Sequence, residues 1–334
     1  MSSSEQKIRW GVLGYAKIAR EMVMPAIQRS SNSVLHALAS RDGAKLAEAR
    51  AKFALPRSFA SYDALLGDAD VDAVYLPLPN SLHREWTLAA AQHGKHVLCE
   101  KPLALHAAEA REMVAACRQH GVLLMEAFMY RYTARTRAVL DVVRSGALGE
   151  IRQINSTFRF LLANPASIKL KPDLGGGALY DVGCYPVNFI GMIVDAIAGG
   201  APGAGGQPDS IAVESLQKDG VDLGFSALLR YASGAMATLN CGFNAHKRVY
   251  SEIIGTEAVL EIPDTFFDNA GALTVITGEQ RREIPVPASD RYRLEVEDFA
   301  DAIRHARDPQ FSLVETLRNA ELMDRLFAAA KAST

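Results

Sequence analysis

The chain has 334 residues, of which 49% are hydrophobic and 22% are charged. This length suits two domains, and the composition excludes an intrinsically disordered chain. The formal net charge of −2 gives no electrostatic basis for nucleic acid or a membrane surface as a partner.

The N-terminal segment and the cysteines indicate where the protein works. Residues 1–7 contain no apolar signal core, and no apolar run approaches the ~18 residues that span a bilayer. The cysteines show no paired spacing, which argues against a zinc site or a disulfide framework. We therefore expect a cytoplasmic protein with buried thiols at Cys99, Cys117, Cys184 and Cys241.

Short apolar runs alternate with helical spacing through the first part of the chain. The expected strands are residues 8–13, 34–39, 71–78, 97–99 and 122–126. The expected helices are residues 19–28, 43–53, 82–93 and 107–120. This alternation predicts an α/β, Rossmann-type, doubly wound parallel sheet, with a dinucleotide-binding domain at residues 1–127.

The pattern then changes to successive strands joined by short turns. These strands are expected at residues 151–160, 210–215, 221–231, 235–242, 251–254, 258–262 and 273–277. They predict an α+β domain with a large, mostly antiparallel open sheet at residues 128–334. Helical spacing returns at residues 295–304 and 313–331, and we expect these C-terminal helices to pack back on the first domain.

Residues 11–19 join the first expected strand to the first expected helix. In the spaced-glycine pattern of dinucleotide-binding turns, Gly14 takes the first position, while Ala16 and Ala19 take the other two. A helix N-terminus here would attract a diphosphate through its amides and its dipole. We expect the turn to bind a dinucleotide through Gly14, Tyr15, Ala16, Lys17 and Ile18. A strand–glycine–helix turn without a ligand is the alternative.

The end of the second strand indicates which dinucleotide. NAD-selective sites usually place Asp or Glu there to bind the ribose 2′-hydroxyl, whereas this chain has Ser40-Arg41 and then Lys45. A guanidinium can pair with a 2′-phosphate in a fork geometry, and Ser40 can donate to it. The sequence therefore favours NADP over NAD. The alternative is that Arg41 is a solvated turn residue.

Two motifs combine into a candidate catalytic group. The first is Glu100-Lys101-Pro102 at the end of the fourth strand, and the second is the glycine-rich stretch 175–188. If a helix begins after Gly177, then Asp181, Tyr185 and Asn188 share one face. The alternatives are a surface turn at Lys101, a packing role for Tyr185 and a helix cap at Asp181.

With these motifs in view, the chain resembles the glucose-fructose oxidoreductase/inositol dehydrogenase (Gfo/Idh/MocA) family over about residues 7–330. Residues 126–131 and 176–185 resemble most the branch of NADP-dependent D-xylose dehydrogenases and dimeric dihydrodiol dehydrogenases. The resemblance implies catalytic roles for Lys101, Asp181 and Tyr185. An unperturbed phenol has a pKa of about 10, and a nearby ammonium favours its phenolate. Tyr185 would thus exchange a hydroxyl proton while hydride moves at the nicotinamide.

The resemblance also implies further binding residues. The loop after the third strand would pass beside the cofactor, as would Glu100; that loop contributes Leu78, Pro79, Asn80 and His83. Alternatively, Asn80 only caps the next helix. Aromatic faces and charged donors suit polyols, so a substrate pocket is expected from Phe128, Arg131, Arg159, Phe160, Lys169 and Asn188, together with Asp181 and Tyr185. The alternative is that these side chains only cover a sheet.

The leading prediction is an NADP-dependent oxidoreductase that oxidises an aldose at C1 to its lactone, or acts on a related cyclic polyol. The alternatives are a dihydrodiol dehydrogenase, a dicarbonyl or keto-sugar reductase, and an NADP-binding sensor or scaffold. We also expect a homodimer or a dimer of dimers through the second-domain sheet. The residues expected on its outer face are Leu228, Tyr231, Met236, Leu239, Cys241 and Phe243. These side chains could instead point into the domain core.

Overall fold

The structure, a computed structural model, describes residues 6–332 and divides into two compact units. Unit 1 contains the chain up to residue 104, residues 108–129 and residues 290–313. Unit 2 contains residues 105–107, residues 130–289 and the chain from residue 314 onward. The expectation of no export signal was drawn from residues 1–7, of which the first five lie outside the described residues.

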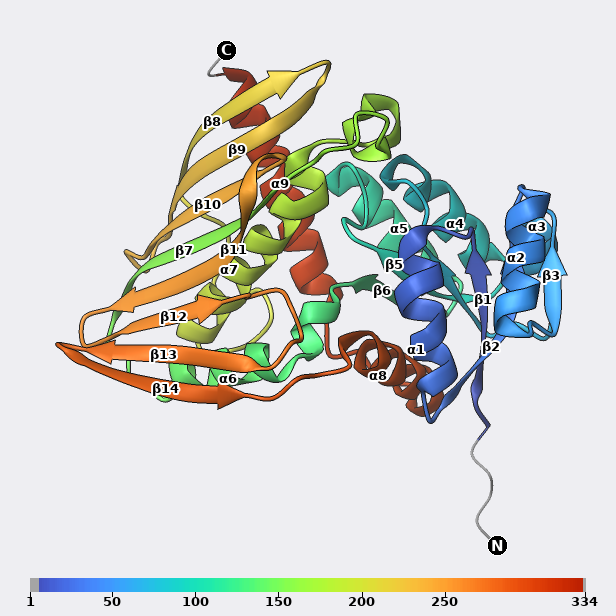
Figure 1. Cartoon of the computed structure of the whole chain (residues 1–334), viewed down its shortest axis with the longest axis horizontal. Coiled ribbons are helices and arrows are strands. Elements are labelled where there is room, and N and C mark those ends of the chain that lie inside the picture. Colours follow the sequence, from blue (N-terminus) through green and yellow to red (C-terminus); the bar gives the residue numbers. More distant parts are fainter. Residues whose placement is uncertain (1–5, 333–334) are drawn as a thin grey trace, which may run out of the picture. The chain divides into compact units, whose positions relative to one another are not determined.

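Unit 1 is built on a parallel sheet with the strand order β3-β2-β1-β4-β5-β6 (Figure 1). The strands are β1 (Ile8–Leu13), β2 (Ser33–Ala39), β3 (Arg57–Phe59), β4 (Ala73–Leu76), β5 (His96–Glu100) and β6 (Leu124–Ala127). Strand order reverses between β1 and β4, and such a switch point is where open α/β sheets bind ligands. The predicted doubly wound parallel sheet is confirmed.

Helices connect these strands and complete the core of unit 1. They are the π-helical segment η1 (Ala19–Val23), α1 (Met24–Arg29), α2 (Gly43–Phe53), α3 (Tyr62–Leu66), the 3₁₀ turn η2 (Asn80–Leu82), α4 (His83–Gln92), α5 (Ala107–Gln119) and α8 (Arg291–His305). Helix α8 packs against α1. There the fully buried rings of Trp10 and Phe299 lie 5.9 Å apart between centroids. A helix from late in the chain therefore closes the core around the first strand.

Unit 2 is built on an eight-stranded sheet with the order β14-β13-β12-β11-β7-β10-β9-β8. Only β7 and β10 pair in parallel, so the prediction of a large, mostly antiparallel sheet is confirmed. The strands are β7 (Ile151–Leu161), β8 (Ser210–Lys218), β9 (Val221–Arg230), β10 (Met236–Gly242), β11 (Asn244–Gly255), β12 (Val259–Pro263), β13 (Gly271–Thr277) and β14 (Gln280–Val286).

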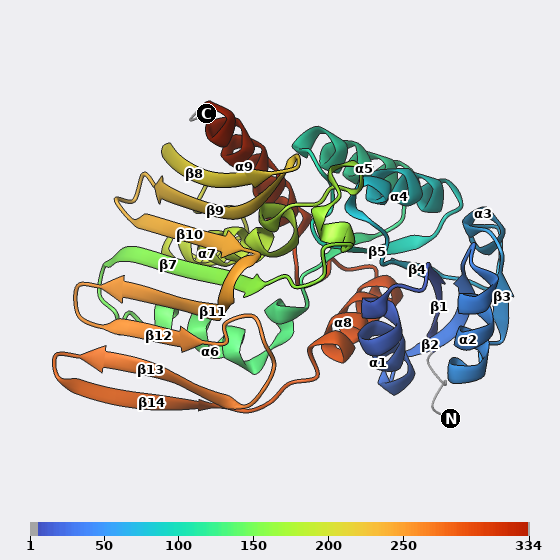
Figure 2. The same ribbon diagram turned by 45° about the horizontal axis from the view of Figure 1, so that its top comes forward.

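Helices cover one face of this large sheet, as the two ribbon views agree (Figure 2). They are α6 (Ala134–Arg144), the π-helical segment η6 (Leu179–Gly183), α7 (Cys184–Ile197) and α9 (Leu313–Ala332), with short 3₁₀ turns η3 (Met129–Tyr132), η4 (Ile168–Leu170) and η5 (Pro172–Leu174). Helix α7 contacts the central strands β7 and β10. The core of unit 2 therefore lies between α7 and the middle of the sheet.

Four elements were not predicted from the sequence. Strand β3 has three residues and α3 has five, both too short for a periodic signal. Strand β14 is an exposed edge strand whose charged residues hide any alternation. Helix α6 lies in a stretch to which we assigned no element, shortly after the expected domain boundary. Strand β4 is also shorter than expected, because only its four central residues pair with β1 and β5.

The expected outer face of the large sheet was wrong at four of its six residues. Tyr231, Leu239, Cys241 and Phe243 are 4% exposed or less and belong to the core of unit 2. Leu228 and Met236 are exposed at 44% and 40%. The side chains of a strand alternate between faces, so Leu239 and Cys241 share the inner face, while Met236, three positions before Leu239, lies on the outer face. Tyr231 and Phe243 lie just beyond their strands, where the alternation no longer applies.

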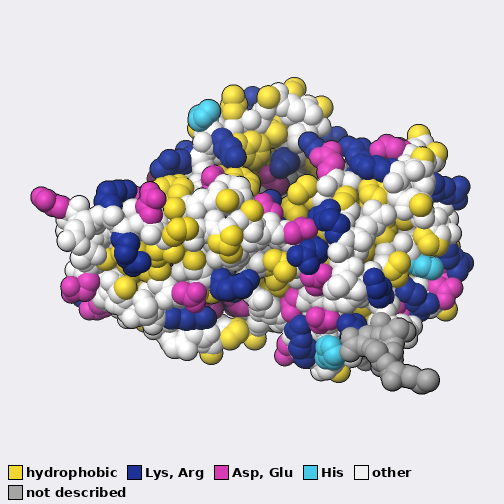
Figure 3. Space-filling view, turned by 60° about the horizontal axis from the view of Figure 1, so that its bottom comes forward, with side chains coloured by type: hydrophobic (Ala, Val, Ile, Leu, Met, Phe, Trp, Pro, Cys, Tyr) yellow, Lys and Arg dark blue, Asp and Glu magenta, His cyan; other side chains and the backbone are white. Residues whose placement is uncertain are grey.

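One helical stretch corrects the expectation that no apolar run could span a bilayer. Among the described residues, 172–197 are long and apolar enough by length and composition, with a mean hydropathy of 1.2 in the best window. However, 94% of that window is buried inside the protein, as in the core helix of a globular domain. The four cysteines are buried thiols, as expected. On the face drawn in Figure 3, cationic and anionic side chains are interspersed.

Candidate active site

The turn after β1 brings the chain into an unusual backbone conformation. Gly14 has a φ of +102°, which only glycine adopts without strain, and its N–H donates to Ala39 O at 2.8 Å. A Cβ on Gly14 would lie 3.1 Å from Leu78 Cδ2. The helix after this turn begins at Lys17, and the preceding Ala16 has no side-chain acceptor with which to cap it. The helix start therefore retains its positive end, which suits the diphosphate of a dinucleotide.

The other residues expected in this turn have different surroundings. Tyr15 is buried, and its hydroxyl donates to Glu48 Oε1 at 3.2 Å, while burial raises the pKa of its phenol. Ala16 is half-buried and lies at the start of the helix. Lys17 has a side chain that is 80% exposed and lies 3.8 Å from Glu21. Tyr15 therefore supports the turn from inside, and Lys17 is a surface residue.

The turn after β2 contains the expected NADP determinant. The Arg41 guanidinium lies over the Tyr62 ring, 5.6 Å from its centroid. Burial raises the pKa of the Tyr62 phenol, and the Arg41 charge opposes that rise. Such stacking holds a guanidinium in one orientation at low conformational freedom. Ser40 is buried and its hydroxyl accepts from Asp42 N–H at 3.2 Å.

Asp42 and Lys45 follow in the same turn. Asp42 caps α2, accepting from Ala44 and Lys45 N–H at 3.0 and 3.2 Å. The Lys45 side chain is 56% exposed and its ammonium lies 4.0 Å from Asp42 Oδ2. The acidic residue of this turn is thus engaged in capping, which leaves the cationic Arg41 and Lys45 as the groups able to meet a phosphate.

His83 joins the loops that follow β4 and β5. It is fully buried, and its Nδ1 and Nε2 lie 2.9 Å from Pro102 O and Leu78 O respectively. Burial lowers the pKa of the imidazole. Since both nitrogens meet backbone carbonyls, His83 fixes the two loops rather than offering a free nitrogen to a ligand. Pro79 begins the 3₁₀ turn η2, and Asn80 is its first residue.

A group of phenols and carboxyls surrounds the end of β5. Glu100 accepts from the fully buried Tyr75 hydroxyl at 2.5 Å, and the Lys101–Pro102 peptide bond is cis. Burial and then the charge of Glu100 raise the pKa of the Glu295 carboxyl well above its usual value. Burial raises the pKa of Tyr292 to about 12, against the Lys101 charge. Lys101 therefore lies near phenols and carboxyls, and Arg291 is a second cation beside the same groups.

In unit 2 the glycine-rich stretch leads into a helix that begins with a π turn. Segment η6 contains Asp181, and α7 continues with Tyr185 and Asn188. The expected helix after Gly177 is present, but its first turn is wider than an α turn, and Pro186 follows where an N–H would be needed. Lys169 Nζ pairs with Asp181 Oδ2 at 2.5 Å. Asp181 is therefore a paired, partly exposed carboxylate.

Aromatic rings surround Tyr185, which is 5% exposed. The ring centroids of Phe158 and Phe266 each lie 5.3 Å from that of Tyr185, and the Tyr130 centroid lies 6.0 Å away. Phe158 and Phe266 are stacked at 5.6 Å with an interplanar angle of 12°. The Lys247 ammonium lies 4.3 Å from the centroid of Phe267, which also contacts Phe158. Tyr185 thus lies in an aromatic cluster that reaches a cation at its edge.

Several expected substrate residues form the core beneath this cluster. Asn188 is fully buried and accepts from Tyr130 Oη at 2.5 Å, and from Arg131 at 3.3 Å. Arg131 also pairs with the buried Glu315 at 2.8 Å. These groups hold α7 in place and are enclosed. Phe128 is likewise buried, in unit 1 against Phe311, with ring centroids 5.4 Å apart.

Two expected substrate residues on β7 are half-buried. Arg159 donates to Cys241 O at 3.0 Å. Phe160 packs on Phe243, with centroids 5.3 Å apart, and the Lys169 ammonium lies 5.3 Å from the Phe160 ring. Arg159, Phe160 and Lys169 are all partly exposed, and the Lys169 ammonium lies beside both Phe160 and Asp181. Unit 2 therefore brings together Asp181, Lys169 and Phe160, three of the residues expected in a substrate pocket.

The sequence prediction missed the residues that hold the site in shape. Their shared property is burial of a polar or aromatic group beside a predicted residue, and they are Tyr62, Tyr75, Phe158, Phe266, Asp222 and Glu295. The adjacent phenylalanines at 266 and 267, in a turn, were a visible signal. The buried carboxyls of Asp222 and Glu295 gave no signal in the sequence, because a lone acidic residue in a strand or helix is usually solvated.

Comparison with known proteins gives the family. The family model described as an oxidoreductase family with an NAD-binding Rossmann fold matches residues 8–128, and the GFO/IDH/MocA C-terminal domain matches residues 136–261. D-xylose 1-dehydrogenase (NADP(+)) 2 of Haloferax volcanii is 36% identical over 328 residues, covering 96% of this chain and 97% of the relative.

Two further proteins show the same relationship. Trans-1,2-dihydrobenzene-1,2-diol dehydrogenase of Xenopus tropicalis is 30% identical over 286 residues, covering 84% of this chain and 81% of the relative. The crystal structure of KijD10, a 3-ketoreductase from Actinomadura kijaniata, in complex with NADP and TDP-benzene, has a TM-score of 0.87. It is 30% identical and covers 97% of this chain and 98% of the other. The protein is therefore an NAD(P)-dependent oxidoreductase that belongs to the Gfo/Idh/MocA family.

Proposed function

We propose that the protein uses NADP to oxidise an aldose at C1 to its lactone, or acts in the same way on a related cyclic polyol. The observation that carries this proposal is the arrangement around Tyr185. A phenol among stacked aromatic rings shares a helix with Asp181, which is paired with Lys169. Aromatic faces suit the C–H face of a sugar ring, and the ion pair offers donors and acceptors to its hydroxyls. The Haloferax relative supports this substrate class.

The preference for NADP rests on Arg41. Its guanidinium is stacked on Tyr62, and the neighbouring carboxylate of Asp42 is used in capping α2. A pre-oriented guanidinium can receive a 2′-phosphate, whereas a ribose hydroxyl gains little from it. The NADP bound in the Actinomadura reductase supports the same assignment.

In this proposal the bound nicotinamide supplies the hydride acceptor or donor. Tyr185 exchanges the proton of the substrate hydroxyl, and Lys101 provides the positive charge that favours its phenolate. Asp181 orients the substrate, with its own direction set by Lys169. Glu100, held by Tyr75, fixes the strand end from which Lys101 projects.

A second candidate function is reduction of a keto-sugar or a dicarbonyl, or oxidation of a dihydrodiol, with the same residues. The half-buried rings of Phe158 and Phe267, which contact each other, favour it, because aromatic faces accept an apolar ring as well as a sugar. The dihydrodiol dehydrogenase and 3-ketoreductase relatives support it too. A sensor or scaffold without turnover is the third candidate, and it gives no reason for Lys101 and Tyr185 together.

The test is the absorbance of reduced cofactor, followed with NADP and with NAD over a panel of aldoses, cyclic polyols and dihydrodiols. Turnover with an aldose and NADP, together with a lactone product, is the expected result. Turnover confined to dihydrodiols or to keto-sugar reduction would favour the second candidate. Tight NADP binding without turnover of any compound would favour the sensor.

We also propose assembly into a dimer, or a dimer of dimers, through the uncovered face of the large sheet. The exposed Leu228 and Met236 support it, beside polar pairs such as Thr238 with Asn155 at 2.5 Å and Ser226 with Asn240 at 2.8 Å. Under a twofold axis the same patch of both subunits would meet, which would bury these side chains in the pair. Light scattering at micromolar concentration tests this, and a particle of 36.1 kDa would contradict it. A cytoplasmic location stays a prediction.

A further inference from the structure

A buried carboxylate from the large sheet meets the start of the helix that bears Asp181 and Tyr185. Asp222 belongs to β9, is 2% exposed, and accepts from Leu179 N–H through Oδ2 at 2.7 Å. Leu179 is the first residue of η6. The N-cap residue of η6, Ala178, makes no side-chain capping bond of its own. The cap therefore comes from a strand 43 residues later in the chain.

The glycine turn is shaped around this carboxylate. Gly177 has a φ of +122°, and a methyl group added to it would overlap Asp222 Oδ1. Its own N–H donates to Lys169 O at 2.9 Å, while its carbonyl accepts from Asp181 N–H at 3.1 Å. The backbone at residue 177 is thus held between Asp222 on one side and the chain around Lys169 on the other.

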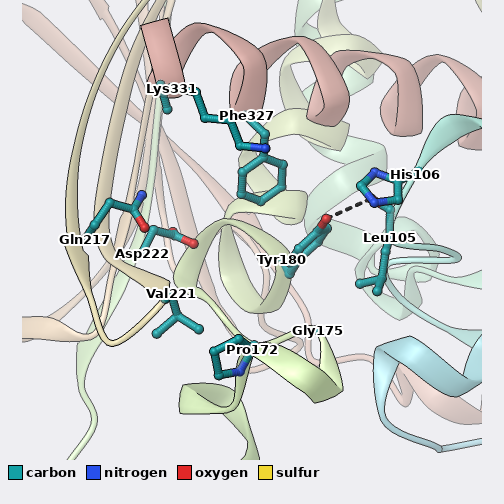
Figure 4. Close-up of a pocket in the computed structure, with 13 residues that line it drawn as sticks. Leu105, His106, Pro172, Gly175, Tyr180, Gln217, Val221, Asp222, Phe327 and Lys331 are labelled. Carbon is teal, nitrogen blue, oxygen red and sulfur yellow. Dashed lines mark hydrogen bonds between the residues drawn. The ribbon is translucent and has the colours of Figure 1, made fainter. Parts of the chain in front are cut away.

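A pocket of about 430 Å³ lies against the same carboxylate (Figure 4). Its wall includes Asp222, Tyr180, Phe327 and Lys331, and Tyr180 Oη donates to Leu105 O at 2.8 Å. Figure 4 shows Asp222 on the sheet side, near the helical turn that carries Tyr180. The pocket gives water a route to a carboxylate that is otherwise enclosed, so protons can exchange there.

We propose that Asp222 is a positioning residue: in its ionised form it holds the first turn of η6 and thereby sets the directions of Asp181 and Tyr185. This inference rests on the proposed function of those two residues. It assigns Asp222 no contact with substrate or cofactor.

The ionised form is required because of the hydrogen-bond donors around Asp222. The N–H groups of Leu179, Ala178 and Asp222 itself are directed at the carboxylate. An ionised carboxylate accepts through both oxygens, but a proton on either oxygen makes that oxygen a donor facing a donor. Protonation would therefore release part of the cap and allow the turn at Gly177 to move.

The pKa of Asp222 places its protonation in a pH range that experiments can reach. Burial raises the pKa of its carboxyl to about 6, and the N–H donors limit that rise. The titratable group that interacts with it is Cys241 on β10, whose own charged and titratable neighbours include Cys184, Arg159 and Asp181. Tyr180, His106 and Lys331 share the pocket wall with Asp222. Relative to the unfolded chain, the raised pKa gives a contribution to stability that is complete below the usual 3.8 and is lost as the pH rises to about 6. The local equilibrium of the turn has the opposite sign: in a moved turn the carboxyl stays buried but loses N–H donors, which raises its pKa further, so protonation favours the moved turn as the pH falls through about 6.

The proposal is tested first on the unmodified protein, without any substrate. Hydrogen exchange of a peptide covering residues 178–185 is measured at about pH 7.5 and about pH 5.5, after correction for intrinsic exchange rates. Protection should fall at the lower pH in this peptide, while a peptide from β10 keeps its protection. Equal protection of residues 178–185 at both values would overturn the proposal. This result does not depend on the substrate, so it is separate from a failure of the proposed function.

The variant Asp222→Asn then tests the link to catalysis. We expect turnover to fall by roughly 10–100-fold, as a small misplacement of reacting groups does, with NADP binding within about twofold of the original. In the unmodified protein, turnover should decrease as the pH falls through about 6, because Asp222 becomes protonated. In Asp222→Asn this decrease should be absent, and the peptide covering residues 178–185 should show the lower protection at both pH values. A thermal melting curve shows whether Asp222→Asn folds. If it does not fold, the hydrogen exchange of the unmodified protein remains the test of the proposal.

Two matched variants assign the effect to Asp222. Asp219→Asn changes an exposed acid in the same hairpin, and His106→Gln changes the imidazole at the pocket wall. Both should retain the original turnover and the decrease near pH 6. If Asp222→Asn matches them in turnover and in pH profile, Asp222 has no positioning role.

Discussion

Two glycine turns, one in each unit, start helices in the same way. Gly14 and Gly177 have φ values of +102° and +122°, in a region that other residues rarely adopt. Each is followed by a five-residue π-helical segment, at Ala19–Val23 and at Leu179–Gly183, which then continues as an α-helix. The same local backbone design thus appears in the dinucleotide-binding sheet and beside the large mixed sheet.

The groups that face these two glycines differ. Near Gly14, the atoms closest to a Cβ position are Leu78 Cδ2 at 3.1 Å and Tyr62 Oη at 3.4 Å, both uncharged. Near Gly177, the space is taken by the Asp222 carboxylate. A helix start that lacks a protein anion is suited to a ligand anion, whereas one that already holds a carboxylate is suited to orienting its own side chains. The comparison supports the proposal that the first turn binds the cofactor and the second carries the chemistry.

The largest effect should come from the second turn. Tyr185→Phe removes the phenol hydroxyl while keeping the ring among Phe158 and Phe266. We expect turnover to fall by roughly 10²–10⁴-fold, the usual scale for a lost general acid or base, with NADP affinity unchanged. Steady-state kinetics and cofactor titration measure the two quantities. Tyr250→Phe, which changes a half-buried tyrosine of β11, is the control. Unchanged turnover would remove Tyr185 from the mechanism.

Changes in the first turn, and in the neighbouring turn that contains Arg41, should alter cofactor affinity and not turnover. Arg41→Ala removes the guanidinium over Tyr62, and NADP affinity should fall by roughly 10–100-fold while NAD affinity stays nearly constant. Fluorescence titration with both cofactors measures this difference. Lys52→Ala, which removes an exposed cation of α2, should change neither value. Equal weakening of both cofactors would reduce Arg41 to a turn residue.

A change at Gly14 should have a smaller effect on affinity and add a loss of stability. Gly14→Ala places a methyl group against Leu78 and forces alanine into a φ of +102°, at about 1–2 kcal/mol. We expect cofactor affinity to fall by about 10-fold, because the turn must move. Gly121→Ala is the matched control, since φ is +66° there and nothing lies within 4 Å of the new methyl group. If Gly121→Ala lowers NADP affinity as much as Gly14→Ala does, the loss of affinity comes from backbone strain in general and not from the turn at Gly14.

The last prediction concerns stability alone, through the buried acid of unit 1. Burial and Glu100 raise the pKa of Glu295, so its contribution to stability is complete below its usual 4.5 and is lost as the pH rises toward its folded value. Glu295→Gln does not titrate. Its free energy of unfolding, relative to the original protein, should therefore increase with pH above 4.5, by at most about 1.4 kcal/mol per pH unit.

Urea unfolding at several pH values measures this difference. Glu85→Gln, at an exposed position of α4, is the control and should show no trend. A difference for Glu295→Gln that is constant with pH would mean that Glu295 ionises normally in the folded protein.

The sequence predicted what periodicity and motif spacing encode. The parallel order around Gly14, the antiparallel strands of the second half and the helix bearing Asp181 and Tyr185 all carry a local pattern. The pairing of Lys169 with Asp181 was within reach, since both lay in the expected substrate set.

The remaining features depend on contacts between distant residues. The contact between Asp222 and Leu179 joins residues 43 positions apart, and Arg131 reaches Glu315 across 184 positions. No local pattern signals such pairs. The inward direction of Leu239 and Cys241 was missed for a related reason: which face of a strand is buried depends on where α7 packs. The π turns were also not predicted, because the spacing of their apolar residues fits an α-helical period nearly as well as a π-helical one.

The placement of α8 has a consequence for synthesis on the ribosome. Domains generally fold as units, the N-terminal one first, as the chain emerges. In this protein Trp10 is covered by Phe299, and unit 1 takes in residues 290–313. The nascent first sheet therefore waits, with part of its core open, until the whole of the second sheet has been translated. Interruption of translation after residue 289 would leave both the ring of Trp10 and the face of α1 without their cover.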